Sequence, residues 1–152
     1  MRLVIQRVMR ASVSSSGELL GSIERGAVAL VGIASGDTSQ LVDRMADKLI
    51  GLRYFDDPEG RTNLSLADVD AALLVVSQFT LLADLRRGRR PGFAFAAAPD
   101  AAEPLVERLC ERLHAAGARV ETGRFGASMQ VELVNDGPFT LLLDSDRDLA
   151  GA

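Results

Sequence analysis

The sequence predicts an α+β fold: a single compact domain in which two main helices pack on a mixed or largely antiparallel, barrel-like β-sheet. Three observations lead to this fold class. Apolar runs typical of strands occur at both ends of the chain, two segments repeat apolar residues at helical spacing, and the repeating βαβ pattern of a doubly wound sheet is absent. The expected order of elements is β-β-β-α-β-β-α-β-β-β.

The first strands follow from the spacing of apolar residues. Residues 2–13 alternate between apolar and polar, a turn is predicted at Ser15-Ser16-Gly17, and alternation then resumes, which indicates a hairpin. The run from Ala27 to Ala34 is continuously apolar and predicts a strand that is buried on both faces.

Two helices are expected, one in each half of the chain. Apolar residues recur at helical spacing from Thr38 to Leu52, with Asp37 as the predicted N-cap. The second helix is predicted from about Asp100 to Ala116, because leucines line one face and Gly117 follows as a stop.

The remaining segments predict strands and loops. A short hairpin is expected around the turn Asp57–Gly60, followed by a buried strand within Leu73–Asp84 and a polar loop from Asp84 to about Pro99. Two or three further strands should follow Gly117, with a break at residues 135–138, where Asn, Asp, Gly and Pro favour a turn.

Length, composition and charge limit the class of protein. The 152 residues, 47% of them hydrophobic and 25% charged, fit one globular domain, 1–152, of which about 145–152 is a C-terminal extension. The net charge of −4 argues against a general nucleic-acid coat protein. No apolar run reaches the roughly 20 residues of a membrane span, and arginines interrupt the apolar N-terminus, so a cytoplasmic protein is expected.

The usual catalytic groups are scarce. His114 is the only histidine and Cys110 the only cysteine, and both fall in the second predicted helix, where a structural role is expected for each. A Ser-His-Asp or Cys-His arrangement therefore has no candidate set of residues, and no glycine-rich phosphate loop occurs. We expect neither a metal nor a cofactor.

Two polar segments interrupt apolar strands instead. Ser77-Gln78-Phe79-Thr80 places two hydroxyls and a carboxamide within an aliphatic run, where unpartnered polar groups cost about 1–3 kcal/mol each if they are buried. Either neighbouring groups satisfy them or a substrate does. For the second segment, Asn135 to Thr140, the residue spacing alone favours a plain turn between strands.

Taken together, these segments resemble the D-aminoacyl-tRNA deacylase family, over the chain from Arg2 to about Asp144. The matching motifs are SQFTLLAD and NDGPFT, together with IQRVMRASV, NLSL, RRPGF and TGRFGASMQV. The resemblance implies a homodimeric chiral proofreading hydrolase with active sites at the subunit interface. Such an enzyme cleaves the ester of D-aminoacyl-tRNA, and of glycyl-tRNA such as glycine mischarged on tRNA(Ala), and spares L-aminoacyl-tRNA.

The resemblance also implies roles for individual residues. Lining the catalytic pocket of one subunit are Ser77, Gln78, Phe79 and Thr80. From the other subunit come Gly137 and Pro138, joined by a cis peptide bond, whose carbonyl oxygens leave no room for an L side chain. Arg7 braces this motif, although a solvent-facing arginine would fit the alternating strand as well. Phe125 and Met129 either shape the pocket or belong to the core.

For the mechanism, the resemblance implies assistance by the 2′-hydroxyl of the RNA and stabilisation of the oxyanion by backbone N–H groups near Phe79 and Thr80. Thr80 is expected to position the substrate, because no base near it in the sequence would activate it as a nucleophile. An arginine loop follows the catalytic strand and is expected either to contact tRNA phosphates or to be a solvated loop; it comprises Arg86, Arg87, Arg89 and Arg90. Two other hypotheses stay open: a non-catalytic RNA-binding module that uses this loop, and a general esterase that uses Thr80.

Overall fold

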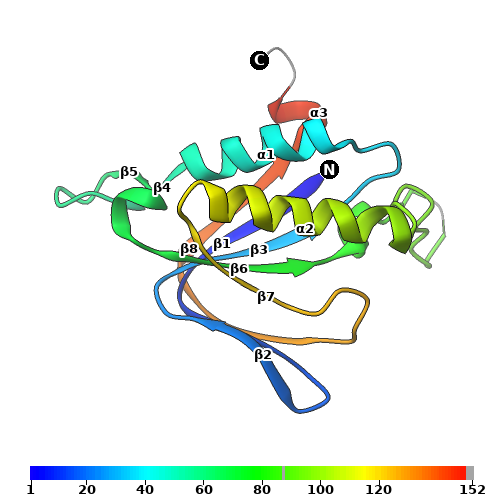
Figure 1. Cartoon of the computed structure of the whole chain (residues 1–152), viewed down its shortest axis with the longest axis horizontal. Coiled ribbons are helices and arrows are strands. Elements are labelled where there is room, and N and C mark those ends of the chain that lie inside the picture. The colour runs from blue at the N-terminus through cyan, green and yellow to red at the C-terminus, as the bar shows by residue number, and fades with distance from the viewer. Residues whose placement is uncertain (87, 150–152) are drawn as a thin grey trace.

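One long strand organises the sheet of this protein. The structure is a computed structural model that describes residues 1–86 and 88–149. Strand β1 (Arg2–Ser15) pairs antiparallel with β8 along one edge and with β3 and then β2 along the other. The sheet continues from β3 to β6 and β7 in parallel, so that it is mixed and curves into an almost closed barrel (Figure 1). The other strands of this sheet are β2 (Glu18–Ile23), β3 (Gly26–Gly32), β6 (Ala72–Ser77), β7 (Arg119–Thr122) and β8 (Gln130–Asp144).

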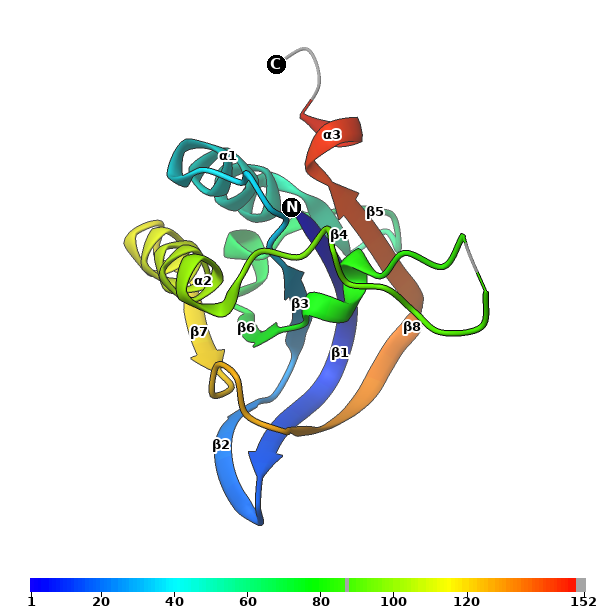
Figure 2. The same cartoon turned by 90° about the vertical axis from the view of Figure 1, so that its right-hand side faces the viewer.

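Helices α1 (Ser39–Gly51) and α2 (Pro99–Ala115) lie side by side on one face of the sheet (Figure 2). Strands β3 and β6 are buried on both faces: Ala29 and Val75 face the helices, while Val28 and Leu74 face the inside of the curved sheet. Parallel strands covered in this way consist of nearly continuous apolar residues, which explains the run that begins at Ala27. No helix within the described ranges is long and apolar enough to cross a membrane.

The predicted α+β class is confirmed, and the element order differs in two places. Three strands separate the main helices, because both strands of the hairpin expected around Asp57–Gly60 form, as β4 (Arg53–Asp56) and β5 (Thr62–Ser65), before β6. Two strands follow α2, because β8 continues through the segment where a break was expected. A short helix α3 (Ser145–Asp148) and two 3₁₀ turns, η1 (Ala67–Val69) and η2 (Phe79–Leu82), complete the elements.

The predicted buried strand within Leu73–Asp84 is shorter than expected. Strand β6 ends at Ser77, the backbone N–H of Gln78 makes a last hydrogen bond to the carbonyl of Val31 at 2.7 Å, and the chain then turns into η2. The polar groups therefore lie at the end of a strand, where Phe79 and Thr80 are exposed. The expected cost of burying them does not arise.

The predicted N-cap of α1 is wrong by one residue. Thr38 caps the helix, with its hydroxyl accepting from the N–H of Leu41 at 3.2 Å. Asp37 instead accepts hydrogen bonds from the N–H of Ala34 at 2.6 Å and from the buried amino group of Met1 at 3.0 Å. These contacts hold the end of β3 against the start of β1.

Candidate active site

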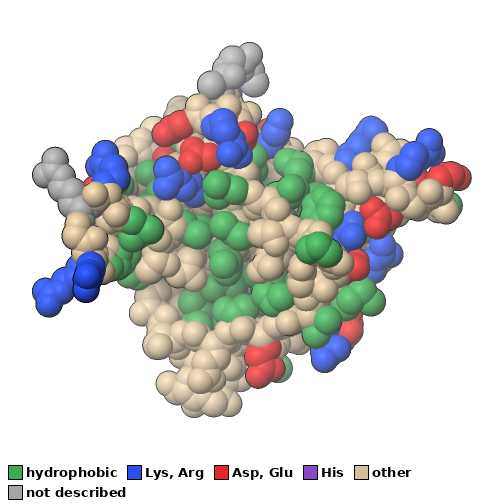
Figure 3. All heavy atoms as spheres, turned by 180° about the vertical axis from the view of Figure 1, so that it is seen from behind, with side chains coloured by type: hydrophobic (Ala, Val, Ile, Leu, Met, Phe, Trp, Pro, Cys, Tyr) green, Lys and Arg blue, Asp and Glu red, His purple; other side chains and the backbone are tan. Residues whose placement is uncertain are grey.

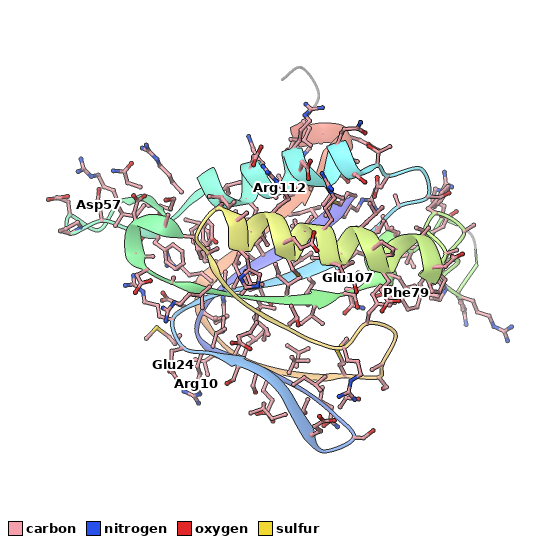
Figure 4. The ribbon with its side chains drawn as sticks, viewed as in Figure 1. Arg10, Glu24, Asp57, Phe79, Glu107 and Arg112 are labelled. Atoms are coloured by element: carbon pink, nitrogen blue, oxygen red, sulfur yellow. The ribbon has the colours of Figure 1, made fainter. Side chains whose placement is uncertain are left out.

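A cavity of about 680 Å³ opens where the parallel strands β3 and β6 end. Its walls come from these strand ends, from η2, from the segment before α2 and the first turns of α2, and from the loop between β7 and β8. Phe79, at the mouth, lies beside the N-terminal end of α2 in Figure 4. The polar, aromatic and sulfur-containing side chains of the lining are those of Ser77, Gln78, Phe79, Phe93, Phe125 and Met129.

The turn from β6 into η2 presents polar groups at the edge of this cavity. The Gln78 carboxamide donates a hydrogen bond to the hydroxyl oxygen of Thr80, which fixes both side chains. The N–H groups of Phe79 and Thr80 begin the 3₁₀ turn, so they have no partner within it. No acceptor for either group occurs among the residues that the structure describes. Two adjacent backbone donors are thus available to an oxygen atom of a ligand.

No side chain of the described chain that lines the cavity titrates near neutral pH. The single histidine, His114, is exposed near the far end of α2, and Cys110 is half-buried in the same helix. Burial raises the pKa of the Cys110 thiol to about 11, which keeps it protonated and unreactive. The cavity can orient a ligand and stabilise charge on it, but its walls supply no acid–base pair.

Phe125 and Met129 come from the loop between β7 and β8 and line the cavity together with Ser77. Each is half-buried, and each also packs against the core, Phe125 on the helix side and Met129 inside the curved sheet. The two interpretations of these residues are therefore compatible, because the same side chains close the core and form the cavity wall.

Gly137 and Pro138 do not line the cavity of their own chain. They lie in a bulge of β8: Gln6 pairs with Thr140 and Val8 with Asn135, so four residues of β8 lie opposite one residue of β1. The peptide bond between Gly137 and Pro138 is cis, and both residues are exposed. The motif thus faces outward from its own subunit.

Arg7 is the residue opposite this bulge, and its side chain is buried, so the interpretation as a solvent-facing arginine is wrong. Its Nε donates to the carbonyl of Asp136 at 3.0 Å, and its Nη1 donates to the carbonyl of Tyr54 at 2.9 Å. Ion pairs at 3.3 Å to Asp56 and Asp136 and a cation–π contact of 4.6 Å to the ring of Phe139 complete its surroundings. Arg7 therefore contacts residues on both sides of Gly137-Pro138, namely Asp136 and Phe139, and links the bulge to Tyr54 of β4.

The four arginines of the predicted loop differ in their surroundings. Arg86 makes a two-point ion pair with Asp84, at 2.8 Å for both hydrogen bonds, and its guanidinium lies over the ring of Phe95. Arg89 and Arg90 are exposed, whereas Arg87 lies outside the described residues. Asp84 thus balances the charge of Arg86, and the contact of these arginines with tRNA phosphates stays a prediction.

The sequence analysis missed three features around the cavity. Phe93 lines its mouth in edge-to-face contact with Phe79, with ring centroids 4.9 Å apart, and Ala96 to Pro99 form a wall. Asp84 orients Arg86, and this hydrogen-bonded pairing lowers the pKa of the carboxyl to about 2. Only the spacing of Asp84 and Arg86, two residues apart, gave a signal in the sequence; the aromatic contacts depend on how the loop folds.

Comparison with known proteins assigns this barrel-like α+β domain and its cavity to a class of hydrolases, the deacylases. The sequence matches the family described as D-Tyr-tRNA(Tyr) deacylase over residues 4–144, and the chain belongs to this family.

Relatives of known name agree with this assignment. The chain is 53% identical to a D-aminoacyl-tRNA deacylase of Symbiobacterium thermophilum, with 97% of each chain covered, and 55% identical to one of Anaeromyxobacter dehalogenans, with 97% of this chain and 99% of that one covered. Among solved structures, one titled c-Myc DNA Unwinding Element Binding Protein matches with a TM-score of 0.89 at 38% identity, covering 95% of this chain and 98% of the other. A probable eukaryotic D-amino acid tRNA deacylase matches in fold, with a TM-score of 0.82 at 20% identity over 93% and 97% of the two chains.

Proposed function

We propose that this protein hydrolyses the ester bond of D-aminoacyl-tRNA, releasing the D-amino acid and free tRNA, and that it rejects L-aminoacyl-tRNA. The observation that carries the proposal is the pair of unpartnered backbone N–H groups, on Phe79 and Thr80, beside a cavity of about 680 Å³ without titratable walls. Membership in the deacylase family supports it.

The chemistry depends on the groups that the cavity offers. An aminoacyl ester is an activated acyl group, so stabilising the oxyanion that forms on its carbonyl is the main help that it needs. One such backbone donor contributes about 2.7–4 kcal/mol to catalysis. The missing acid–base function is supplied by the substrate, through the ribose 2′-hydroxyl next to the ester.

Thr80 positions the substrate in this mechanism. Its hydroxyl oxygen accepts a hydrogen bond from Gln78, so its own proton is directed away from Gln78 and can be donated to the ligand. Activation of Thr80 as a nucleophile requires a base within about 2.6–3.2 Å. The lining residues of the described chain include no base, which argues against a covalent acyl-enzyme.

Selectivity for the D-hand is assigned to Gly137 and Pro138 of a second copy of the chain. In a homodimer, the outward-facing bulge of one subunit enters the cavity of the other, where its carbonyl oxygens leave room for hydrogen but not for an L side chain. This rejection by collision needs no contact with the varied side chain. Glycine, which has only hydrogen at this position, is then accepted, and glycyl-tRNA, including glycine mischarged on tRNA(Ala), is a substrate.

An apolar surface supports the homodimer. On the face opposite to α1 and α2, hydrophobic side chains gather across the centre (Figure 3). Among the exposed large apolar side chains, Met9 on β1 and Val134 and Leu142 on β8 are 51%, 38% and 49% exposed, respectively. Contiguous apolar surface of this kind is typical of protein–protein interfaces. We place the enzyme in the cytoplasm, where aminoacyl-tRNA is used.

The test is a paired deacylation assay with D-Tyr-tRNA and L-Tyr-tRNA, using the wild-type chain and Thr80→Ala. We expect rapid release of D-tyrosine, no release of L-tyrosine above the spontaneous rate, and a loss of activity in the variant. Equal hydrolysis of both substrates, or of neither, would contradict the proposal. Hydrolysis of a simple D-tyrosine ester at the same rate, with a trapped acyl-enzyme, would instead favour a general esterase.

A further inference from the structure

Three exposed aromatic rings and one arginine form two contact pairs on η2 and the loop that follows it, and the first pair lies at the mouth of the cavity. We call these four residues the aromatic ledge; they are Phe79, Phe93, Phe95 and Arg86. Phe79 and Phe93 meet edge to face at 4.9 Å between ring centroids, and the Arg86 guanidinium lies 5.4 Å from the centroid of Phe95. Phe79 and Phe95 are 56% and 50% exposed, which is unusual for such large apolar side chains.

The backbone holds the ledge in place. Asp84 and Gly92 exchange two backbone hydrogen bonds of 2.7 and 3.0 Å, which close the arginine loop at its base. The carbonyl of Phe95 accepts from the N–H of Ser35 at 2.9 Å, and Ala97 donates to Ile33 at 2.9 Å. The rings therefore stand on fixed backbone on the outside of the molecule, a position that core packing does not require.

The charges on the ledge favour stacking over a simple phosphate contact at Arg86. Asp84 holds the edge of the Arg86 guanidinium through two hydrogen bonds and balances its charge, which leaves the flat face for stacking. Arg89 and Arg90 lie further along the same loop and are exposed. Within the described ranges no carboxylate forms an ion pair with them. Exposed aromatic rings bordered by exposed arginines are the arrangement that binds unpaired nucleotides.

We propose that the aromatic ledge binds the single-stranded nucleotides that directly precede the terminal adenosine of the tRNA, by stacking their bases on Phe95 and Arg86. This inference rests on the proposed function, because it takes the cavity as the site of the aminoacylated adenosine. Phe95 and Arg86 do not line the cavity, so they contact a part of the substrate beyond that adenosine. The single-stranded end of tRNA is the part that continues from it.

The experiment compares two substrates of different length. One is 3′-O-D-tyrosyl-adenosine, which fills the cavity alone, and the other is the trinucleotide CCA that carries D-tyrosine on its terminal adenosine. Phe95→Ala should lower kcat/KM for the trinucleotide by roughly 5- to 150-fold, the range for one base stacked on an aromatic side chain. The variant should leave kcat/KM for the aminoacyl-adenosine unchanged, which also shows that it is folded. Phe95→Tyr should keep wild-type activity on both substrates.

Leu85→Ala is the matched control, since Leu85 is a 73% exposed apolar residue of the same loop that forms none of the ring contacts. It should affect neither substrate. Equal losses on both substrates in Phe95→Ala, or no loss on either, would overturn the inference.

A binding measurement separates this inference from the proposed function. A fluorescein-labelled CCA with D-tyrosine in a non-hydrolysable amide linkage should bind the wild-type chain more tightly than Phe95→Ala by the same factor. If binding of the probe depends on Phe95 but the wild type hydrolyses no ester, the proposed function is wrong and nucleotide binding by the aromatic ledge is supported. If the wild type hydrolyses D-Tyr-tRNA and Phe95→Ala binds the probe as tightly as the wild type, the proposed function is supported and nucleotide binding by the ledge is wrong.

Discussion

Replacing Arg7 by alanine should destabilise the protein strongly, because the buried Arg7 side chain joins β1 to the bulge of β8 and to β4. The substitution removes hydrogen bonds to the carbonyls of Asp136 and Tyr54, at 3.0 and 2.9 Å, and the cation–π contact to Phe139. Hydrogen bonds from a charged donor contribute roughly 1.5–3 kcal/mol each, so two of them amount to about 3–6 kcal/mol. Breaking a buried ion pair typically costs about 3–5 kcal/mol, which agrees with this range.

The assay is thermal unfolding followed by circular dichroism. For a domain of this size each kcal/mol corresponds to roughly 2–4 °C, so Arg7→Ala should lower Tm by about 6–24 °C. The Tm of Arg7→Lys should lie between those of Arg7→Ala and the wild type, because an ammonium group can donate to one of the two carbonyls but cannot reach both.

Arg10→Ala is the matched control, an exposed arginine three residues further along β1, with an expected change within about 0.5 kcal/mol. A Tm drop below about 2 °C in Arg7→Ala, or one no larger than in Arg10→Ala, would refute the argument that Arg7 braces the bulge. The D-Tyr-tRNA assay at a temperature where the variant is folded then tests whether bracing matters for activity. Unchanged activity would separate the stability of the bulge from its proposed role in the partner's cavity.

Three further predictions concern the bulge and the arginine loop. Gly137→Ala should lower Tm and abolish D-Tyr-tRNA hydrolysis, because the added methyl group would collide with the backbone nitrogen two residues further along the bulge; wild-type Tm and activity would contradict this. The hydrogen-bonded Arg86 lowers the pKa of Asp84 from 3.8 to about 2, so the pair stabilises the fold above about pH 4, and this contribution is lost as the pH falls towards 2. Acid unfolding monitored by circular dichroism should therefore be less steep between about pH 4 and 2 in Asp84→Asn than in the wild type, and identical curves would argue against the pair. Replacing both Arg89 and Arg90 by alanine should raise KM for D-Tyr-tRNA and reduce the dependence of log(kcat/KM) on log salt by roughly 0.7 per lost phosphate contact, with 3′-O-D-tyrosyl-adenosine unaffected; an unchanged salt dependence would indicate a solvated loop.

The sequence predicted the elements whose burial is uniform. The strand predicted over the run Ala27–Ala34 forms as β3 (Gly26–Gly32), two residues shorter at its end, because both of its faces are covered. Helix α2 was predicted within one residue because its apolar face and Gly117 agree on the end. The end of β6 was missed because the aliphatic pattern continues past the turn into Leu81 and Leu82. Only the partner strand, which ends at Gly32, determines where the ladder stops.

The site could be predicted only in part, because some of its contacts depend on residues far apart in the sequence. Motif resemblance indicated Ser77 to Thr80, and the structure brings three of these four residues, Ser77, Gln78 and Phe79, to the cavity wall. The continuity of β8 across its turn residues was missed because it depends on pairing with β1 on both sides of Arg7. The contact between Arg86 and Phe95 was missed because it joins residues nine positions apart through a loop without regular structure.

The absence of titratable side chains from the lining of the cavity, within the described chain, has a consequence for kinetics. A bell-shaped pH–rate profile ordinarily reports the acid and base of the enzyme. If the proposed function holds, the inflection should belong to the ligand, whose α-amino group titrates near about pH 8. Changing the amino acid on the tRNA should move the inflection, whereas replacing polar residues of the wall should scale the rate at every pH and leave the inflection where it is.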